Sequence, residues 1–121
     1  MTWQKEIDEL HAREQMAYAM GGPDKVARQH EFNKLTIRER IHAISDADSF
    51  HEIGTLAGVG EYSPDGDLTA FRPSNFVFGT AEIDGRPVIL SGDDFTVRGG
   101  SADASIPGKR LRAEGLALEL K

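Results

Sequence analysis

The first 45 residues carry apolar side chains at three- and four-residue spacing, the period of an α-helix. Residues 2–20, 23–33 and 34–44 therefore predict three successive helices. Thr2 is the expected N-cap of the first helix, and Pro23 is expected in the first turn of the second. The apolar stripe of the first helix is thin and consists of Trp3, Ile7, Leu10, Ala17 and Met20. Such a helix is marginal alone, so we expect an arm that lies on another part of the protein.

The third helix has a clear start. Thr36 is followed three residues later by Glu39, which is the capping-box pattern. Its expected buried stripe consists of Ile37, Ile41 and Ile44. The sequence thus predicts a helical arm over residues 1–45.

From residue 51 on, the pattern changes from helical to β-type. Residues 51–56 suit a strand, and residues 61–67 have strong turn chemistry. Residues 75–83 and 86–90 predict an antiparallel hairpin, because the Asp-Gly pair at 84–85 tolerates positive φ at both turn positions. The expected shared core consists of Phe76, Phe78, Ile83, Val88 and Leu90.

Residues 88–101 predict a strand, a glycine turn and the start of a helical segment in succession. Gly99 and Gly100 form the turn, and Ser101 is the natural N-cap of the helical segment. Free backbone N–H groups gather at such a point, which suits an anion or a polarised carbonyl. A Gly-Gly turn also serves as a sharp bend without any ligand.

The segment 102–121 is rich in leucine and predicts the last helix. Pro107 and Gly108 interrupt its first turns, so the regular helix is expected to begin near Lys109.

Composition limits the classes of function. The chain has 121 residues, a net charge of −6, 39% hydrophobic residues and no cysteine. This length suits one domain at most, and the acidic balance argues against nucleic acid and anionic membrane surfaces as partners. The absence of cysteine excludes disulfides, thiolate metal sites and cysteine nucleophiles. No apolar run approaches a membrane span, and the charged N-terminus is unlike a signal peptide, so a cytoplasmic location is expected.

Candidate catalytic residues are few. Asp93 and Asp94 could form a general base or a metal pair, but adjacent side chains on a strand point to opposite faces, which favours a structural role. The histidines have no ligand spacing; they are His11, His30, His42 and His51. We therefore assign no catalytic and no metal-ligating residue.

Basic residues between positions 28 and 40 run against the acidic average; they are Arg28, Lys34, Arg38 and Arg40. Two interpretations stay open. The residues form a solvated helix face with surface ion pairs, or they bind phosphate or an acidic partner surface.

Five motifs occur in register along the chain: residues 21–30 (GGPDKVARQH), 34–41 (KLTIRERI), 48–54 (DSFHEIG), 76–88 (FVFGTAEIDGRPV) and 93–101 (DDFTVRGGS). Together they resemble the N-terminal part of the carboxyltransferase (β) subunit of biotin-dependent acyl-CoA carboxylases, of the propionyl-CoA and acetyl-CoA carboxylase type. The resemblance covers residues 20–121.

The resemblance implies an α+β (α/β) fold, with a partial crotonase-like ββα unit over residues 46–121 after the helical arm. In this family the N-terminal half binds acyl-CoA and the C-terminal half binds biotin. Carboxybiotin gives its carboxyl group to the α-carbon of the acyl thioester, and backbone N–H groups stabilise the enolate. The implied ligands are acyl-CoA and carboxybiotin, with no covalently bound cofactor.

By the same resemblance, the CoA-binding candidates are Gly99, Gly100, Ser101 and Ala102. Weaker candidates for phosphate contact are Lys109, Arg110 and Arg112, for which a solvated helix face is the alternative.

The family's oxyanion-hole loop and biotin half would lie beyond Lys121, so the resemblance implies either a truncated chain or a small protein that encodes only the first ββα portion. In both cases the chain is expected not to carboxylate or decarboxylate acyl-CoA alone. The implied partners are the biotin carboxyl carrier and biotin carboxylase components and further copies of the chain. One alternative is a non-catalytic interaction module that oligomerises or completes a separately encoded carboxyltransferase chain. Another is a free-standing CoA or nucleotide binder.

Overall fold

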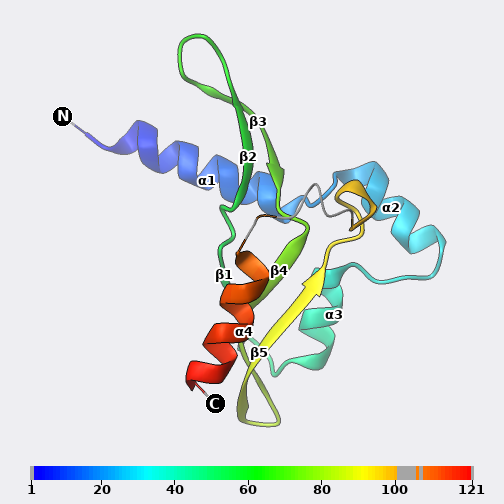
Figure 1. The fold of residues 1–121 in the computed structure, drawn as a ribbon. Helices are drawn as coiled ribbons and strands as arrows, with labels where there is room; N and C mark the ends of the chain where they lie inside the picture. Colours follow the sequence, from blue (N-terminus) through cyan, green and yellow to red (C-terminus); the bar gives the residue numbers. More distant parts are fainter. Residues whose placement is uncertain (1, 101–105, 107, 121) are drawn as a thin grey trace.

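The structure is a computed structural model, and it describes residues 2–100, 106 and 108–120. Within these residues three helices come first, then five strands, a 3-10 turn and a last helix (Figure 1). Their bounds are α1 Gln4–Tyr18, α2 Pro23–Glu31, α3 Ile37–Ile44, β1 His51–Ile53, β2 Gly58–Tyr62, β3 Leu68–Pro73, β4 Phe76–Ile83, β5 Arg86–Asp93, η1 Arg98–Gly100 and α4 Lys109–Leu120. The expected mixed helix and sheet class is confirmed, as is the beginning of α4 at Lys109.

Among the first three helices, the predicted start is found for α2 and α3 but not for α1. The capping box at α3 is confirmed, because Thr36 Oγ1 accepts from the Glu39 N–H and Glu39 Oε1 accepts from the Thr36 N–H. Pro23 lies at the start of α2 as predicted. The prediction for Thr2 is wrong: Trp3 occupies the N-cap of α1, and no side chain caps that helix.

A three-stranded antiparallel sheet of order β1-β4-β5 forms the centre of the protein. The predicted hairpin is confirmed, with positive φ at Asp84 and Gly85, and its register runs from Phe76↔Asp93 to Ile83↔Arg86. Side chains alternate between the two faces of the sheet. Phe76 and Phe78 therefore face one side, and the residue between them faces the other.

The two faces of the sheet carry different helices, so the protein has three layers. On one face Phe76 and Phe78 pack with Ala113 of α4 to form the core cluster. On the other face Ile37 of α3 fills the space left by the missing side chain of Gly92, where a Cβ would lie 2.1 Å from its Cδ1 atom.

Part of the expected core is corrected. Phe76 and Phe78 are buried, but Ile83, Val88 and Leu90 are only half-buried. The register pairs Val88 with Ala81 and Leu90 with Gly79, so Ile83, Val88 and Leu90 lie on the face of the sheet opposite Phe76 and Phe78 and do not share their core. Ile44 is 56% exposed because it is the last residue of the short α3.

A second hairpin, β2–β3, projects from the sheet and packs against α1 (Figure 1). The turn predicted over residues 61–67 is present but shorter, because Glu61 and Tyr62 belong to β2, and the two strands were not predicted. Gly58 weakens the strand pattern, and it is needed there because a Cβ would lie 2.5 Å from the Phe71 ring. The thin apolar stripe of α1 fits this position: Ala17 is buried, whereas Trp3 stays 70% exposed.

Candidate functional site

The turn after β5, residues 94–100, is held by a buried carboxylate. Asp94 is 2% exposed, and its Oδ1 accepts hydrogen bonds from the Thr96 N–H (2.9 Å) and hydroxyl (2.6 Å). The Asp94 N–H donates to the Asn75 carbonyl at 2.6 Å. On the other side of the chain, exposed Asp93 pairs with Arg110 at 2.9 Å. Both carboxylates therefore have structural partners, in agreement with the structural interpretation of this pair.

The glycines end this turn in a left-handed conformation. Arg98, Gly99 and Gly100 have φ values of 53°, 59° and 75°. A Cβ on Gly100 would lie 3.5 Å from the Phe95 ring, whereas one on Gly99 would meet no neighbour within 4 Å. Gly99 is thus open to a ligand. The other two candidates of this motif, Ser101 and Ala102, lie outside the described residues.

A close backbone approach joins this turn to the link between α1 and α2. The Gly21 N–H donates to the Thr96 hydroxyl at 2.9 Å. A Cβ on Gly21 would lie 1.9 Å from the Thr96 carbonyl oxygen, so no other residue fits without moving the backbone. This contact sets α2 beside the turn.

A basic groove lies between α2 and the turn. It is a cavity of about 310 Å³ whose lining contains three cations and, within the described residues, no carboxylate. We define the basic groove by its lining residues Lys25, Arg28, Gln29, Phe32, Lys34, Phe95, Thr96 and Gly99. A second cavity of about 270 Å³ adjoins it on the α3 side and shares Lys34 and Phe95. Its lining adds Arg40 but also Asp93 and Asp94.

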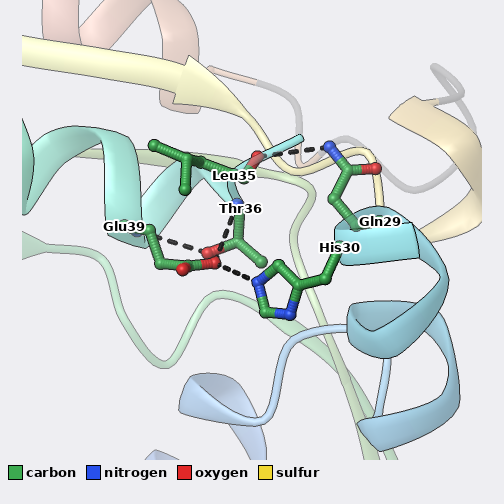
Figure 2. Close-up of polar contacts among 5 residues, drawn as sticks. All are labelled: Gln29, His30, Leu35, Thr36 and Glu39. Atoms are coloured by element: carbon green, nitrogen blue, oxygen red, sulfur yellow. Dashed lines mark hydrogen bonds and ion pairs between the residues drawn. The ribbon is translucent and has the colours of Figure 1, made fainter. Parts of the chain in front are cut away.

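The corner between α2 and α3 is fixed by two adjacent side chains (Figure 2). Gln29 Nε2 donates to the Leu35 carbonyl at 3.2 Å, and His30 Nε2 lies 2.6 Å from Glu39 Oε1. The hydrogen bond from His30, together with those from the backbone and hydroxyl of Thr36, lowers the pKa of Glu39 to about 2. The charge on Glu39 therefore persists into acid.

Three of the other basic candidates, Arg38, Arg110 and Arg112, pair with carboxylates outside the groove. Arg38 forms a paired contact with Glu52, whose side chain is only 8% exposed, and it also lies over the Tyr18 ring. Beside this pair, burial lowers the pKa of Lys109, while the charge of Glu52 opposes that shift.

The last two basic candidates lie on the exposed surface of α4. Arg110 pairs with Asp93, and Arg112 lies 3.5 Å from Glu119. None of the three α4 candidates lines the basic groove.

Three of the eight lining residues of the groove were candidates from the sequence: Arg28, Lys34 and Gly99. The other five were missed: Lys25, Gln29, Phe32, Phe95 and Thr96. An exposed Phe in a polar turn was the available signal, since Phe95 stands between two acidic residues and a threonine. No pattern of neighbouring residues in the sequence connects Phe95 to Lys25, because only the fold brings the two side chains together.

The described part of the chain holds no group of three or more metal-ligating side chains in reach of one ion. In the same residues, no helix has the length and apolar character that crossing a membrane requires.

No profile of a known protein family matches the sequence. The chain is 32% identical to the propionyl-CoA carboxylase carboxyltransferase subunit of Haloferax mediterranei, over 99% of this chain and 23% of that protein. It is 37% identical to a biotin-dependent acetyl-/propionyl-coenzyme A carboxylase beta5 subunit of Mycobacterium tuberculosis, over 93% of this chain and 21% of that protein. The chain thus spans less than a quarter of the length of these relatives.

Solved structures that resemble this chain also come from carboxyl-transferring enzymes of acyl-CoA. A transcarboxylase 12S, described as a hexamer with methylmalonyl-coenzyme A and methylmalonic acid bound, superposes with a TM-score of 0.79 at 31% identity. That match covers 99% of this chain and 24% of the other. A single-chain, multi-domain long-chain acyl-CoA carboxylase gives a TM-score of 0.74 at 26% identity, over 94% of this chain and 13% of the other.

Proposed function

Because the chain belongs to the carboxyltransferase-subunit family of biotin-dependent acyl-CoA carboxylases, we propose that it forms part of the acyl-CoA side of such an enzyme. Its fold is the crotonase-like fold of that family. The proposed reaction moves a carboxyl group from carboxybiotin to the α-carbon of an acyl-CoA. The role of this chain is to hold the nucleotide end of that substrate.

One observation carries the proposal. Gly99, which the family resemblance makes a CoA-binding candidate, lines a groove with three cations and no carboxylate among its described residues. The chain as a whole has a net charge of −6, so this groove is a local reversal of sign. Phosphate groups are the ligands that such a concave basic surface attracts. CoA carries three of them at its nucleotide end.

We propose the division into a helical arm, residues 1–45, and a ββα unit, residues 46–121. In this division each part supplies one wall of the groove. The arm provides the basic face of α2, and the ββα unit provides the turn after β5.

We assign carboxyl transfer itself to parts of the subunit outside the aligned segment. The groove offers cations, glycine backbone and aromatic rings, and no described side chain in it has the character of a general base. The 121-residue chain is therefore expected to give no turnover of malonyl-type thioesters with free biotin. Measurable carboxyl transfer by the purified chain would contradict this assignment.

Calorimetric titration of the 121-residue chain with CoA tests the binding role. We expect saturable binding of CoA, and no binding of pantetheine at the same concentrations, because pantetheine lacks the nucleotide end. Rising salt should weaken CoA binding, since the contacts are charged. Equal affinity for pantetheine, or only heat of dilution with CoA, would contradict the proposal.

A second role, as an interaction module, has its own observation. Leu111, Leu118 and Leu120 of α4 are 62% to 72% exposed. Leu120 also lines an apolar cavity of about 290 Å³ beside Val88 and Ile89. Exposed apolar surface of this kind favours association, either with further copies or with the rest of a carboxylase complex. Light scattering decides: a stable oligomer supports this role, and a clean monomer contradicts self-association.

A further inference from the structure

We propose that the basic groove recognises the 3′-phosphate of CoA, and that Lys25 and Arg28 are the residues that select for it. This inference rests on the proposed CoA-binding function and gives the groove a specificity. It concerns the face of α2 and the turn after β5.

The face of α2 that lines the groove has a regular spacing. Lys25, Arg28, Gln29 and Phe32 occupy positions i, i+3, i+4 and i+7, which fall on one side of a helix. All four line the groove. The two cations are therefore neighbours on the helix and point toward the same space.

These two cations have no carboxylate partner among the described residues. The contact of Arg28 is with an aromatic ring, since its guanidinium lies 5.9 Å from the centre of Phe32. Like charges three residues apart on a helix repel each other, so this pair is unfavourable without an anion. Three arginines of α3 and α4 behave differently, since Arg38, Arg110 and Arg112 each pair with a carboxylate.

Two aromatic rings flank the cations. Phe32 is 62% exposed and Phe95 is 64% exposed. Phe95 is held outward because its neighbours Asp94 and Thr96 are buried and bonded to each other. A fixed, exposed ring beside cations is the composition that binds a base next to a phosphate.

The phosphate groups of CoA differ in charge, and this difference indicates which of them the basic groove binds. A phosphomonoester such as the 3′-phosphate carries close to two negative charges at neutral pH, whereas each phosphate of a pyrophosphate diester carries about one. The basic groove has no carboxylate in its described lining, while the adjoining cavity contains Asp93 and Asp94. The dianion therefore belongs beside Lys25 and Arg28. Lys34, which lines both cavities, then contacts the pyrophosphate, and Phe95 contacts the adenine ring.

The test compares two ligands on several variants by calorimetry. The wild-type chain should bind CoA about tenfold more tightly than dephospho-CoA, which lacks only the 3′-phosphate. The double variant Lys25→Gln with Arg28→Gln should lose this preference and bind CoA only as tightly as dephospho-CoA. Both residues are exposed, so the fold is expected to persist, which circular dichroism checks.

Three further variants separate charge from position. Lys25→Arg keeps the charge and should keep the preference for CoA. Arg86→Gln removes one exposed cation at the opposite end of the β4–β5 hairpin and should change neither affinity. Phe95→Leu should weaken both ligands by the same factor, because the ring contacts a part that they share.

The outcomes are distinct. Equal affinity of the wild type for the two ligands, or a preference that survives in the double variant, overturns the assignment of Lys25 and Arg28 while the CoA-binding function stands. Absence of binding for both ligands overturns the proposed function and this inference together.

Discussion

Nε2 of His30, near the end of α2, lies 2.6 Å from Oε1 of Glu39 in the first turn of α3 (Figure 2). The same Glu39 oxygen accepts the Thr36 N–H at 3.0 Å, so one carboxylate both caps α3 and fastens α2 to it. The basic face of α2 is thereby held over the turn after β5. This corner is expected to influence both stability and the shape of the groove.

The stability of the corner should depend on pH in the acid range. The pKa of Glu39 is about 2 in the folded protein, below its ordinary value of 4.5. The ionised carboxylate therefore adds to the free energy of unfolding in full above pH 4.5, and this contribution is lost as pH falls toward 2. Glu39→Gln is therefore expected to be less stable than the wild type at pH 7, with a difference that vanishes near pH 2. Urea unfolding at a series of pH values measures this difference, and a pH-independent gap would contradict it.

Replacing Gly21 should disturb the groove from a distance. In Gly21→Ala the new Cβ would lie 1.9 Å from the Thr96 carbonyl oxygen, so the link and the turn must separate. We expect a loss of stability of about 1–3 kcal/mol, the range of overpacking, together with weaker CoA binding. Thermal unfolding and calorimetry measure the two effects.

Gly115→Ala is the matched control for that substitution. Gly115 lies in α4, and a Cβ there meets no neighbour within 4 Å. Alanine should stabilise the helix by about 0.5–1 kcal/mol and leave CoA affinity unchanged. If Gly21→Ala and Gly115→Ala had the same effects on stability and CoA affinity, the close approach at Gly21 would not be the contact that positions α2.

The pair of Arg38 and Glu52 is expected to be the largest electrostatic contribution to the fold. Both side chains are mostly buried, at 18% and 8% exposure. Glu52→Gln leaves the Arg38 charge buried without its counter-ion, so the free energy of unfolding should fall by about 3 kcal/mol. It also removes the attraction that partly sustains the pKa of Lys109, which should fall further. Chemical denaturation measures the first effect, and a change below about 0.5 kcal/mol would contradict the expected role of burial.

Local structure could be predicted where it depends on neighbours in sequence. The capping box at Thr36, the Asp-Gly turn at 84–85 and the start of α4 at Lys109 follow from short-range backbone chemistry. The N-cap at Thr2 was wrong because Trp3 already takes that position without a side-chain bond. The hairpin turn also uses a partner that no local pattern reveals: Asp46 accepts the N–H groups of Asp84 and Gly85.

The parts of the candidate site could be predicted, but not that they form one site. The glycine turn and the basic residues of the arm were both visible in the sequence, but as separate features. Their meeting depends on the close contact of Gly21 with Thr96, which are 75 residues apart. The strands of β2–β3 were missed for a similar reason, since the glycine at 58 makes room for the distant Phe71.

In the proposed function, this chain holds the nucleotide end of an acyl-CoA between α2 and the turn after β5. The most direct test is a titration of the ¹⁵N-labelled chain with CoA, monitored by amide chemical shifts. We expect the largest shifts at Lys25, Arg28, Phe95 and Gly99, with none in the β2–β3 hairpin, Gly58–Tyr62 and Leu68–Pro73. Largest shifts in that hairpin or on α4, or no shifts at saturating CoA, would contradict it.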